Sequence, residues 1–568
     1  MCSMSESRRR RTAAAIAVAV VVALAGCVGI PTSGSVQTGP VIGTQLNPEF
    51  VVLPSGPQPG ATKEQILADF MQAVRGPQND YAIAREFLST DLAGKWNPDA
   101  SALIRTTAAV TTPGSAANML DYSVTSKAYV DETGRYIEQD AATQSLQFGF
   151  MKESGEWRIN KAADGIVLSQ SSFKVGFTEQ ALFYFDPSFS YLIPDVRWFP
   201  SRATVSVRIA RALLAGPAAW LQQGVVSTSF PVATALGSRT IQISAGTATV
   251  DLSKEALAAS PQDRDRMRQQ FLATLAPTLG VSTVDMTVGG IALQTPGPSN
   301  PGAIVNPAVE SAVLVGTKTE FGFAAETGLT PIDRVSTIVT AAGATAATLS
   351  GDHQYAAFLG SDGAAFVAGA AASGPGRALD SRAGLAVPTI DPFRYLWSAR
   401  ADSAASLTTF DFDGTEHPVQ SGLSTGARIV SMALSRDGTR MLLYLSTANG
   451  PELRIAGVIR GAANLPIRLG DPLTLSAPSG QPISAAWVDD RTVASISTGS
   501  DGADVTVFQV GGPSAPLGQL PDAVALTGGN GGTDGLRVLR SSGEIWRPQG
   551  SAGWVATGLS ASFLGTKQ

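Results

Sequence analysis

The chain of 568 residues has few residues able to hold a metal or form a disulfide, with two cysteines and two histidines. Cys2 and Cys27 both lie near the N-terminus, so the rest has no thiol for a disulfide, a thiolate zinc site or a cysteine nucleophile. Neither His353 nor His417 lies in a cluster with cysteine or carboxylates at metal-ligand spacing. We therefore expect no metal, no cofactor, and stability that comes from core burial.

Charge is also scarce, at 15% of residues, and the formal net charge is −5. A mildly acidic chain is a poor candidate for a nucleic-acid binder, because such proteins present basic surfaces. Glycine and proline are abundant, with 59 and 34 residues, which is typical of short strands joined by tight turns. The length alone predicts about three to four domains.

The apolar run over residues 12–26 is shorter than the about 20 residues that a membrane-spanning helix needs. It follows four arginines, residues 8–11, and fits the apolar region of a secretory signal over residues 1–26. Its end, Leu24-Ala25-Gly26-Cys27, resembles the lipobox of bacterial lipoproteins. The resemblance implies cleavage before Cys27, which then carries S-diacylglycerol and an N-linked acyl chain such as palmitate. The alternative is an ordinary secretory signal with a chance cysteine.

Residues 27–61 are punctuated by glycine, proline, serine and threonine, which predicts a flexible tether after the lipidated cysteine. A first domain is expected over residues 62–175. Thr62 and Gln65 form a capping-box pattern before a helical apolar stripe, a second helix is expected over residues 81–92, and strand-like segments turn at residues 132–134 and 153–155. Helices followed by a curved antiparallel sheet resemble the NTF2-like α+β fold.

A second domain is expected over residues 176–293. Two strands flank the turn at Asp186, a helix stops at Gly216-Pro217, and a long helix begins at Ser260 with Pro261 in its first turn. The blocks at residues 213–217 and 248–253, the long helix and a final strand resemble the GerMN domain. GerMN domains are small α/β modules of exported envelope proteins, and the resemblance implies a binding role.

Residues 294–308 are rich in proline, glycine and asparagine and predict a linker. Beyond it, over residues 309–568, pairs of hydrophobic strands flank polar turns that carry Asp352, Asp391, Asp437 and Asp489. Repetition every 40–50 residues or so in an all-β region is typical of propeller blades. We expect an all-β propeller of about five or six blades.

Several patterns could carry chemistry, and each has a simpler interpretation. Ser171-Ser172-Phe173-Lys174 matches the short Ser-x-x-Lys motif, but no Lys-Thr-Gly partner occurs. The glycine-rich stretch 528–535 lacks the order of a phosphate-binding loop, and the acidic pairs Asp131-Glu132 and Asp489-Asp490 fall at turns, where solvated carboxylates are common. The sequence therefore predicts no catalytic residue, and a propeller glycosidase stays open as a third hypothesis.

Aromatic residues crowd part of the second domain: Phe189, Tyr191, Trp198, Phe199 and Trp220. Packing in the core or between domains is the favoured interpretation. The alternative is an aromatic contact surface for a partner or a glycan.

The order of lipobox, tether, α+β domain, GerMN-like domain and propeller resembles the actinobacterial LpqB lipoprotein family. The resemblance implies a non-enzymatic protein, anchored by lipid on the extracytoplasmic face of the cell membrane, that regulates a two-component sensor histidine kinase of the MtrB/MtrA type in cell-envelope homeostasis. Its expected partner is the extracytoplasmic domain of the kinase, through surfaces that the sequence does not identify. The alternative is a protein that binds peptidoglycan or organises cell-wall hydrolases.

Overall fold

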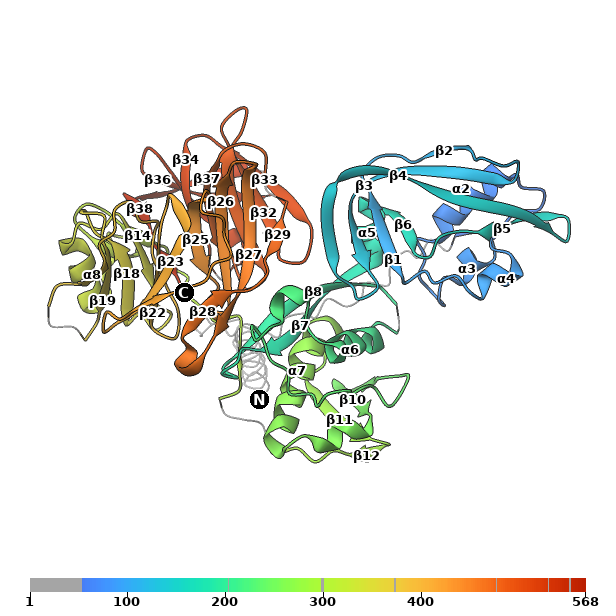
Figure 1. Ribbon diagram of the computed structural model, residues 1–568, viewed down its shortest axis with the longest axis horizontal. Coiled ribbons are helices and arrows are strands. Elements are labelled where there is room, and N and C mark those ends of the chain that lie inside the picture. The colour runs from blue at the N-terminus through green and yellow to red at the C-terminus, as the bar shows by residue number, and fades with distance from the viewer. Residues whose placement is uncertain are drawn as a thin grey trace, which may run out of the picture. The chain divides into compact units, whose positions relative to one another are not determined.

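The computed structural model describes residues 54–202, 204–297, 301–371, 374–476, 478–529, 531–550 and 553–568. Over these residues the chain forms an α+β domain, an α/β domain and a ring of β-sheets, in that order (Figure 1). The expected multidomain architecture is therefore confirmed. The expected signal segment, Cys27 and nearly all of the expected tether lie outside the described residues.

The first domain packs short helices on one curved sheet with strand order β5-β4-β3-β1-β6, to which β2 adds by pairing with β3. The predicted capping box is present, since Gln65 N donates to Thr62 Oγ1 at 3.3 Å and Thr62 N donates to Gln65 Oε1 at 2.9 Å. The elements are α2 (Lys63–Ala73), α3 (Ala82–Arg85), α4 (Thr90–Ala93), β1 (Ser101–Arg105), β2 (Val110–Pro113), β3 (Met119–Asp131), β4 (Tyr136–Glu153), β5 (Glu156–Lys161), β6 (Ile166–Ser169) and α5 (Gln170–Gly176).

The single helix expected over residues 81–92 is wrong, because the segment forms the two short helices α3 and α4. Between them the backbone pairs with β5: Ile159 N donates to Phe87 O at 2.9 Å and Ser89 N donates to Ile159 O at 2.7 Å. The side chain of Ser89 then caps α4. Tertiary pairing with a distant strand thus overrides the local helical pattern.

The second domain combines the hairpin β7–β8 with two helices and a four-stranded sheet of order β12-β11-β10-β9. The predicted start of the long helix is confirmed, since Asp263 N donates to Ser260 Oγ at 3.1 Å and Pro261 lies in the first turn. The elements are β7 (Phe177–Phe185), β8 (Tyr191–Pro200), α6 (Val205–Ala215), η1 (Ala219–Leu221), β9 (Gln242–Ser244), β10 (Thr247–Leu252), η2 (Lys254–Ala258), α7 (Pro261–Leu279), β11 (Thr283–Val288) and β12 (Ile291–Ala292).

Part of the segment predicted as a linker, residues 294–308, is a strand. β13 (Ile304–Val305) pairs in parallel with β8, with Ile304 opposite Tyr191. Its partner lies more than a hundred residues earlier, so local composition gave no signal for this pairing.

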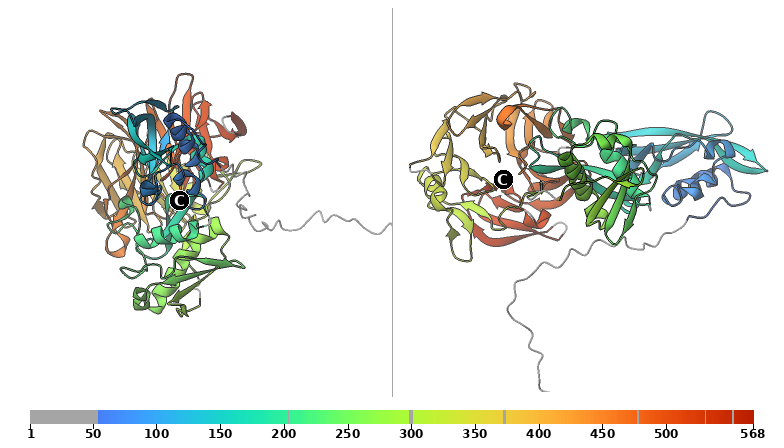
Figure 2. Two further views of the ribbon diagram at one scale, coloured as in Figure 1. Left: turned by 90° about the vertical axis from the view of Figure 1, so that its right-hand side faces the viewer. Right: turned by 90° about the horizontal axis from the view of Figure 1, so that it is seen from below.

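Six sheets of four or five strands form the C-terminal domain, and Figure 2 shows them arranged in a ring. The first three sheets contain β14 (Leu314–Gly316), β15 (Phe321–Ala324), β16 (Leu329–Thr330); β17 (Ala346–Leu349), β18 (Tyr355–Leu359), β19 (Ala365–Gly369), β20 (Arg377–Asp380); and β21 (Thr389–Ile390), β22 (Tyr395–Arg400), β23 (Ser403–Asp411), β24 (Glu416–Pro418). Helix α8 (Asp333–Ala341) and the turn η3 (Ala462–Asn464) are additions to this ring.

The other three sheets contain β25 (Arg428–Leu434), β26 (Arg440–Thr447), β27 (Gly450–Arg460), β28 (Pro466–Leu469), β29 (Leu473–Leu475); β30 (Pro482–Trp487), β31 (Thr492–Thr498), β32 (Ala503–Gln509), β33 (Ser514–Leu520); and β34 (Ala523–Thr527), β35 (Arg537–Arg540), β36 (Glu544–Gln549), β37 (Gly553–Ser560). The short turn η4 (Gly532–Gly535) lies within the glycine-rich stretch. The all-β propeller is confirmed, with six blades among the described residues.

The C-terminal segment closes the ring. β38 (Phe563–Leu564) pairs with β14 of the first blade, and β39 (Thr566–Lys567) pairs with β17 of the second. Gly316 makes room for this closure, because a Cβ atom there would lie 2.1 Å from the ring of Phe563. Pairing the last strands with the first blades removes open strand edges from the ring.

The predicted turn aspartates repeat one hydrogen bond around the propeller. Asp352, Asp391, Asp437 and Asp489 each follow the first strand of a blade. In each case Oδ1 accepts the backbone N–H two residues on, at 2.9–3.0 Å. A short side chain that bonds its own turn explains why this residue recurs at this position.

Close packing joins the second domain to the propeller. Val225 lies against Gly457, where a Cβ atom would come within 2.4 Å of Val225 Cγ2. Trp198 Nε1 donates to Gly511 O at 3.0 Å, and Arg491 pairs with Glu179 at 2.9 Å. An apolar contact flanked by polar ones thus fixes this junction.

Candidate functional site

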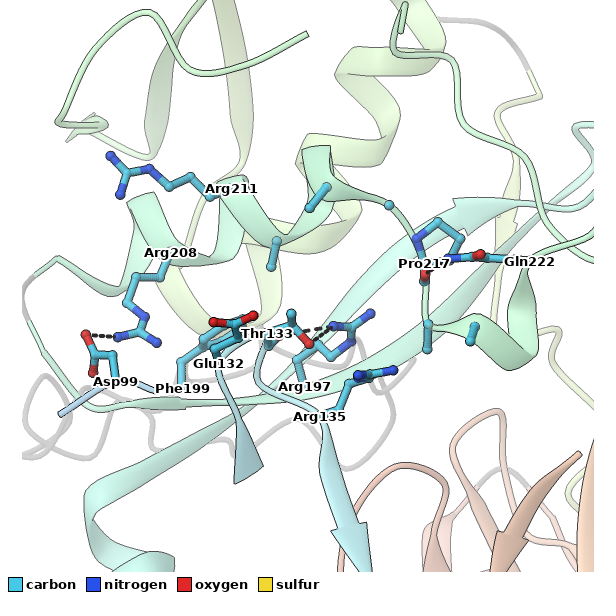
Figure 3. A pocket seen from close by; sticks show the side chains of 15 residues that line it. Asp99, Glu132, Thr133, Arg135, Arg197, Phe199, Arg208, Arg211, Pro217 and Gln222 are labelled. Atoms are coloured by element: carbon cyan, nitrogen blue, oxygen red, sulfur yellow. Dashed lines mark hydrogen bonds and ion pairs between the residues drawn. The ribbon is translucent and has the colours of Figure 1, made fainter. Parts of the chain in front are cut away.

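A cavity of about 560 Å³ lies between the first domain and the second (Figure 3). The hairpin between β3 and β4 forms one wall, β8 the floor, and α6 with the segment after it the other wall. Its lining residues are Asp99, Glu132, Thr133, Arg135, Arg197, Phe199, Arg208, Arg211, Ala212, Ala215, Gly216, Pro217, Ala218, Ala219 and Gln222. Four of these are arginines and two are acidic, which distinguishes the cavity from an apolar core defect.

Helix α6 supplies two of the arginines from one face. Arg208 and Arg211 are three residues apart, and Ala212 and Ala215 continue the same face one turn on. The opposite face carries buried residues, including Ile209, Ala210 and Leu213, and anchors the helix in the domain core. The two alanines leave the cavity open beside the arginines, and the helix ends at Gly216, whose φ is 98°.

The floor of the cavity contains a buried ion pair. Arg197 donates to Asp195 through Nε at 3.1 Å and Nη2 at 2.6 Å, and both side chains are 4% exposed. Burial lowers the pKa of Arg197, but the Asp195 carboxylate outweighs burial and leaves the pKa above its usual value. Asp195 Oδ2 also accepts Ala218 N at 2.8 Å, so the pair positions the segment after α6.

The β3–β4 hairpin is held against this floor. Arg197 Nη1 donates to Thr133 O at 3.0 Å, and Trp198 N donates to Gly134 O at 2.7 Å. Within the hairpin, Arg135 Nε donates to Asp131 Oδ2 at 2.8 Å. Burial raises the pKa of Asp131, but hydrogen bonds from Thr133 and Arg135 outweigh it, so the pKa is lowered overall.

Asp99 clamps the two domains together at the other end of the cavity. Its carboxylate pairs with Arg202 and with Arg208 Nη1, the latter at 2.5 Å. The Arg202 guanidinium also lies over the ring of Tyr81, 4.9 Å from its centroid. Asp99 and Tyr81 belong to the first domain and both arginines to the second, so this end is a polar domain contact.

Two charged side chains of the cavity remain uncommitted. Over the residues that the structure describes, neither Arg211 nor Glu132 has a hydrogen-bond or ion-pair partner, and both are exposed. Guanidinium groups stay protonated and donate hydrogen bonds, so they bind and orient anions but do not relay protons. The arrangement is suited to binding an anion rather than to acid–base catalysis.

The patterns that could carry chemistry are not brought together. Ser171 and Lys174 lie exposed on α5, and the Ser171 hydroxyl bonds Ser169 at 2.9 Å. His353 lies beside Phe323 in a propeller turn, and His417 lies 3.6 Å from Asp411. No group of three or more histidine, cysteine or acidic side chains able to hold a metal occurs in the described ranges.

Three residues of the two acidic pairs contact neighbouring groups in their own turns. Asp131 accepts a hydrogen bond from Arg135 of its own hairpin, and Asp489 accepts one from Arg491 N of its own turn. Glu132 lines the cavity. Asp490 is buried, with Arg491 Nε at 3.5 Å. The glycine-rich stretch 528–535 includes Gly528, which lies against Trp487 O.

The aromatic residues of the second domain pack in its core and against neighbouring domains, as the favoured interpretation predicted. Phe199 is buried, Trp198 lies 5.0 Å from the Phe173 ring centroid, and Trp220 packs on core clusters of both the second domain and the propeller. Phe189 lies beside Phe185, and Tyr191 packs on the core of the second domain. The cavity was not predicted from the sequence, where its one signal is the spacing of Arg208 and Arg211 on the polar face of a helix.

Cys27 lies outside the described residues, so its lipidation stays a prediction. In the part of the chain that the structure describes, no helix combines the length and hydropathy needed to cross a membrane.

Three protein-family models match separate parts of the chain. A model described as the N-terminal domain of lipoprotein LpqB matches residues 56–174. One described as sporulation and spore germination matches residues 181–294, and one described as the LpqB β-propeller domain matches residues 325–561. These matches follow the order of the three structural domains.

Curated relatives carry the same description. Lipoprotein LpqB of Cutibacterium acnes is 29% identical over 273 residues, which cover 48% of this chain and 46% of that protein. Lipoprotein LpqB of Rhodococcus jostii is 25% identical over 534 residues, which cover 88% of this chain and 86% of the relative. The chain thus spans about half the length of the first relative and most of the second.

Among solved structures, the first GerMN domain of the sporulation protein GerM from Bacillus subtilis is similar to part of the chain. The identity is 21% and the TM-score 0.18, over 22% of this chain and 93% of that domain.

Proposed function

Because the chain belongs to the LpqB lipoprotein family, we propose that it is a lipid-anchored extracytoplasmic protein that regulates a sensor histidine kinase of the MtrB type. The family name already identifies a membrane lipoprotein with a propeller domain. The kinase partner, the anchor at Cys27 and the role in cell-envelope homeostasis are parts of the proposal. The observation that carries it is the succession of domains along the chain: two match LpqB models, and the domain between them matches the sporulation and spore germination model.

The proposed mode of action is binding rather than catalysis. The side chains singled out for chemistry lie on separate elements, and the Ser171 hydroxyl and the Asp489 carboxylate each bond within their own segment. The arginines around the cavity donate hydrogen bonds but do not give up a proton, so they are not suited to acid–base catalysis. A protein of this kind acts through the surfaces that it presents to a partner.

A lipid anchor would make even a weak contact effective. When two partners are confined to one membrane, their effective concentration rises, so that a low-affinity interface suffices for regulation. Two acyl chains hold a protein on the membrane stably where a single chain does not. Cys27 would thus contribute to regulation as well as to localisation.

The experiment that tests the partner is co-purification of the mature chain with the extracytoplasmic domain of the kinase. We expect saturable binding that survives moderate salt. A parallel pull-down on purified cell wall tests the alternative that the chain binds peptidoglycan. Binding to cell wall without binding to the kinase would favour that alternative and contradict the proposal.

The anchor is tested by Cys27→Ala. We expect the variant, after signal cleavage, to leave the membrane fraction, because no acyl chain can be attached. Its affinity for the isolated kinase domain in solution should match that of the unlipidated wild-type chain. A variant that stays in the membrane fraction would contradict the role of Cys27.

A further inference from the structure

We infer that the cavity between the β3–β4 hairpin, β8 and α6 binds a small organic anion, a molecule with a carboxylate or phosphate attached to a compact apolar body. The inference concerns a ligand site and stands independently of the kinase contact. It is carried by the guanidinium of Arg211, which has no partner among the described residues and projects on the same side as Arg208, and by the apolar residues that line the cavity (Figure 3).

The arginines differ in how many of their donors are already used. Arg197 uses all three of its side-chain nitrogens, in hydrogen bonds to Asp195 and Thr133. Arg208 uses Nη1 for Asp99, and Arg135 uses Nε and Nη2 for Asp131. A guanidinium carries five N–H groups, so Arg208 and Arg135 keep donors for a further acceptor, whereas Arg211 has no partner among the described residues.

The remaining walls are apolar and small. Ala212, Ala215 and Pro217 line one side, and the buried ring of Phe199 lies beneath, with the Arg208 guanidinium 5.9 Å from its centroid. The volume of about 560 Å³ falls in the range of small-molecule sites, which are largely apolar with a few placed polar groups. The anionic group would contact Arg208 and Arg211, while the apolar body of the ligand would cover these walls.

Two features of the cavity oppose an anion. Glu132 adds an uncommitted negative charge, and α6 ends at the cavity, where the partial charge of a helix is negative. The second feature also offers a purely structural role for Arg211, since cations stabilise helix C-terminal ends. That role needs only a positive charge, whereas recognition of a carboxylate or phosphate uses the planar fork of arginine.

The test measures binding of phenyl phosphate and of benzoate to the mature chain by calorimetry, with benzyl alcohol as the neutral analogue. We expect saturable binding of at least one of the two anions and none of benzyl alcohol, with an affinity that falls as ionic strength rises. The two anions distinguish a phosphate ligand from a carboxylate ligand. Absence of saturable binding by both anions would overturn the inference.

Variants of exposed residues locate the ligand. Arg211→Gln should weaken binding about tenfold, because a charge-assisted hydrogen bond is lost. Arg211→Lys should weaken it too, although it keeps the charge that the helix end requires, and Glu132→Gln should tighten it. Arg239→Gln, at an exposed arginine of the same domain, is the matched control. The inferred anion site would be contradicted if all four variants bound the anion with equal affinity. It would also be contradicted if Arg211→Lys bound the anion as tightly as the wild-type chain.

Discussion

Asp391 and Arg460 lie on neighbouring blades of the propeller and form an ion pair 2.8 Å long, with side chains 0% and 3% exposed. Asp391 is one of the recurring turn aspartates, and its Oδ2 also accepts Trp397 Nε1 at 3.1 Å. The Arg460 guanidinium lies 4.6 Å from the ring centroid of Phe393. The aspartate turn, which recurs in four of the six blades, thus also joins one blade to the next at this position.

Removing one partner of this pair is expected to be costly. Arg460→Met leaves the buried Asp391 carboxylate without its cation, and loss of one member of a buried pair typically costs about 3–5 kcal/mol. We expect the thermal transition of the propeller to move clearly downward, measured by calorimetry on the mature chain. The control is Arg400→Met, since Arg400 and Asp402 form an exposed pair that contributes about 1 kcal/mol or less. Equal shifts for the two variants would refute this account.

Asp490 is expected to weaken the fold at neutral pH. Burial, together with Asp489 and Asp437, raises its pKa, although Arg491 and Arg440 act in the opposite direction. A carboxyl group whose pKa is raised in the folded state holds its proton more tightly there, so its ionisation lowers the free energy of unfolding as pH rises.

Asp490→Asn should therefore raise the midpoint of thermal unfolding at pH 7. The gain should shrink as pH falls and vanish below about pH 4, where folded and unfolded chains are both protonated. Asp489→Ala, which removes the acceptor of Arg491 N, should instead lower the midpoint. A midpoint for Asp490→Asn that is unchanged at every pH would show that burial does not penalise this charge.

The contact between the second domain and the propeller depends on Gly457, which has no side chain and leaves room for Val225. Gly457→Ala places a methyl group about where Val225 packs, and such overpacking typically costs about 1–3 kcal/mol. We expect faster proteolysis of the segment 294–308 between the two domains. Gly426→Ala is the control, because nothing lies within 4 Å of a Cβ atom there.

A second substitution shows whether the effect arises at this contact. Val225→Ala makes space, so the double variant Gly457→Ala with Val225→Ala should be less sensitive than Gly457→Ala alone. Purely additive effects of the two substitutions would contradict direct packing between these residues.

Local sequence signals predicted much of the fold. The capping box at Thr62, the N-cap at Ser260 and the turn aspartates each encode a hydrogen bond between near neighbours, and the structure contains each of them. What the sequence could not reveal depends on distant partners. The break between α3 and α4 follows from pairing with β5, and ring closure follows from pairing of β38 with β14.

The candidate site could not be predicted from the sequence either, because its residues come from distant parts of the chain. Arg135 lies in the turn between β3 and β4, Arg197 on β8 and Arg208 on α6, far apart in the sequence. Only folding brings them around one cavity. The aromatic residues that stood out in the sequence instead fill cores and the domain junction, because large apolar side chains gain most from burial.

The most direct test of the proposed function measures kinase output in a shared membrane. The full-length kinase is reconstituted in vesicles with increasing amounts of the lipidated chain, and its autophosphorylation rate is recorded. The account predicts a saturable change in rate that Cys27→Ala reproduces only at much higher bulk concentration, because membrane confinement is lost. A rate that stays constant at every density of the lipidated chain would contradict a regulatory role.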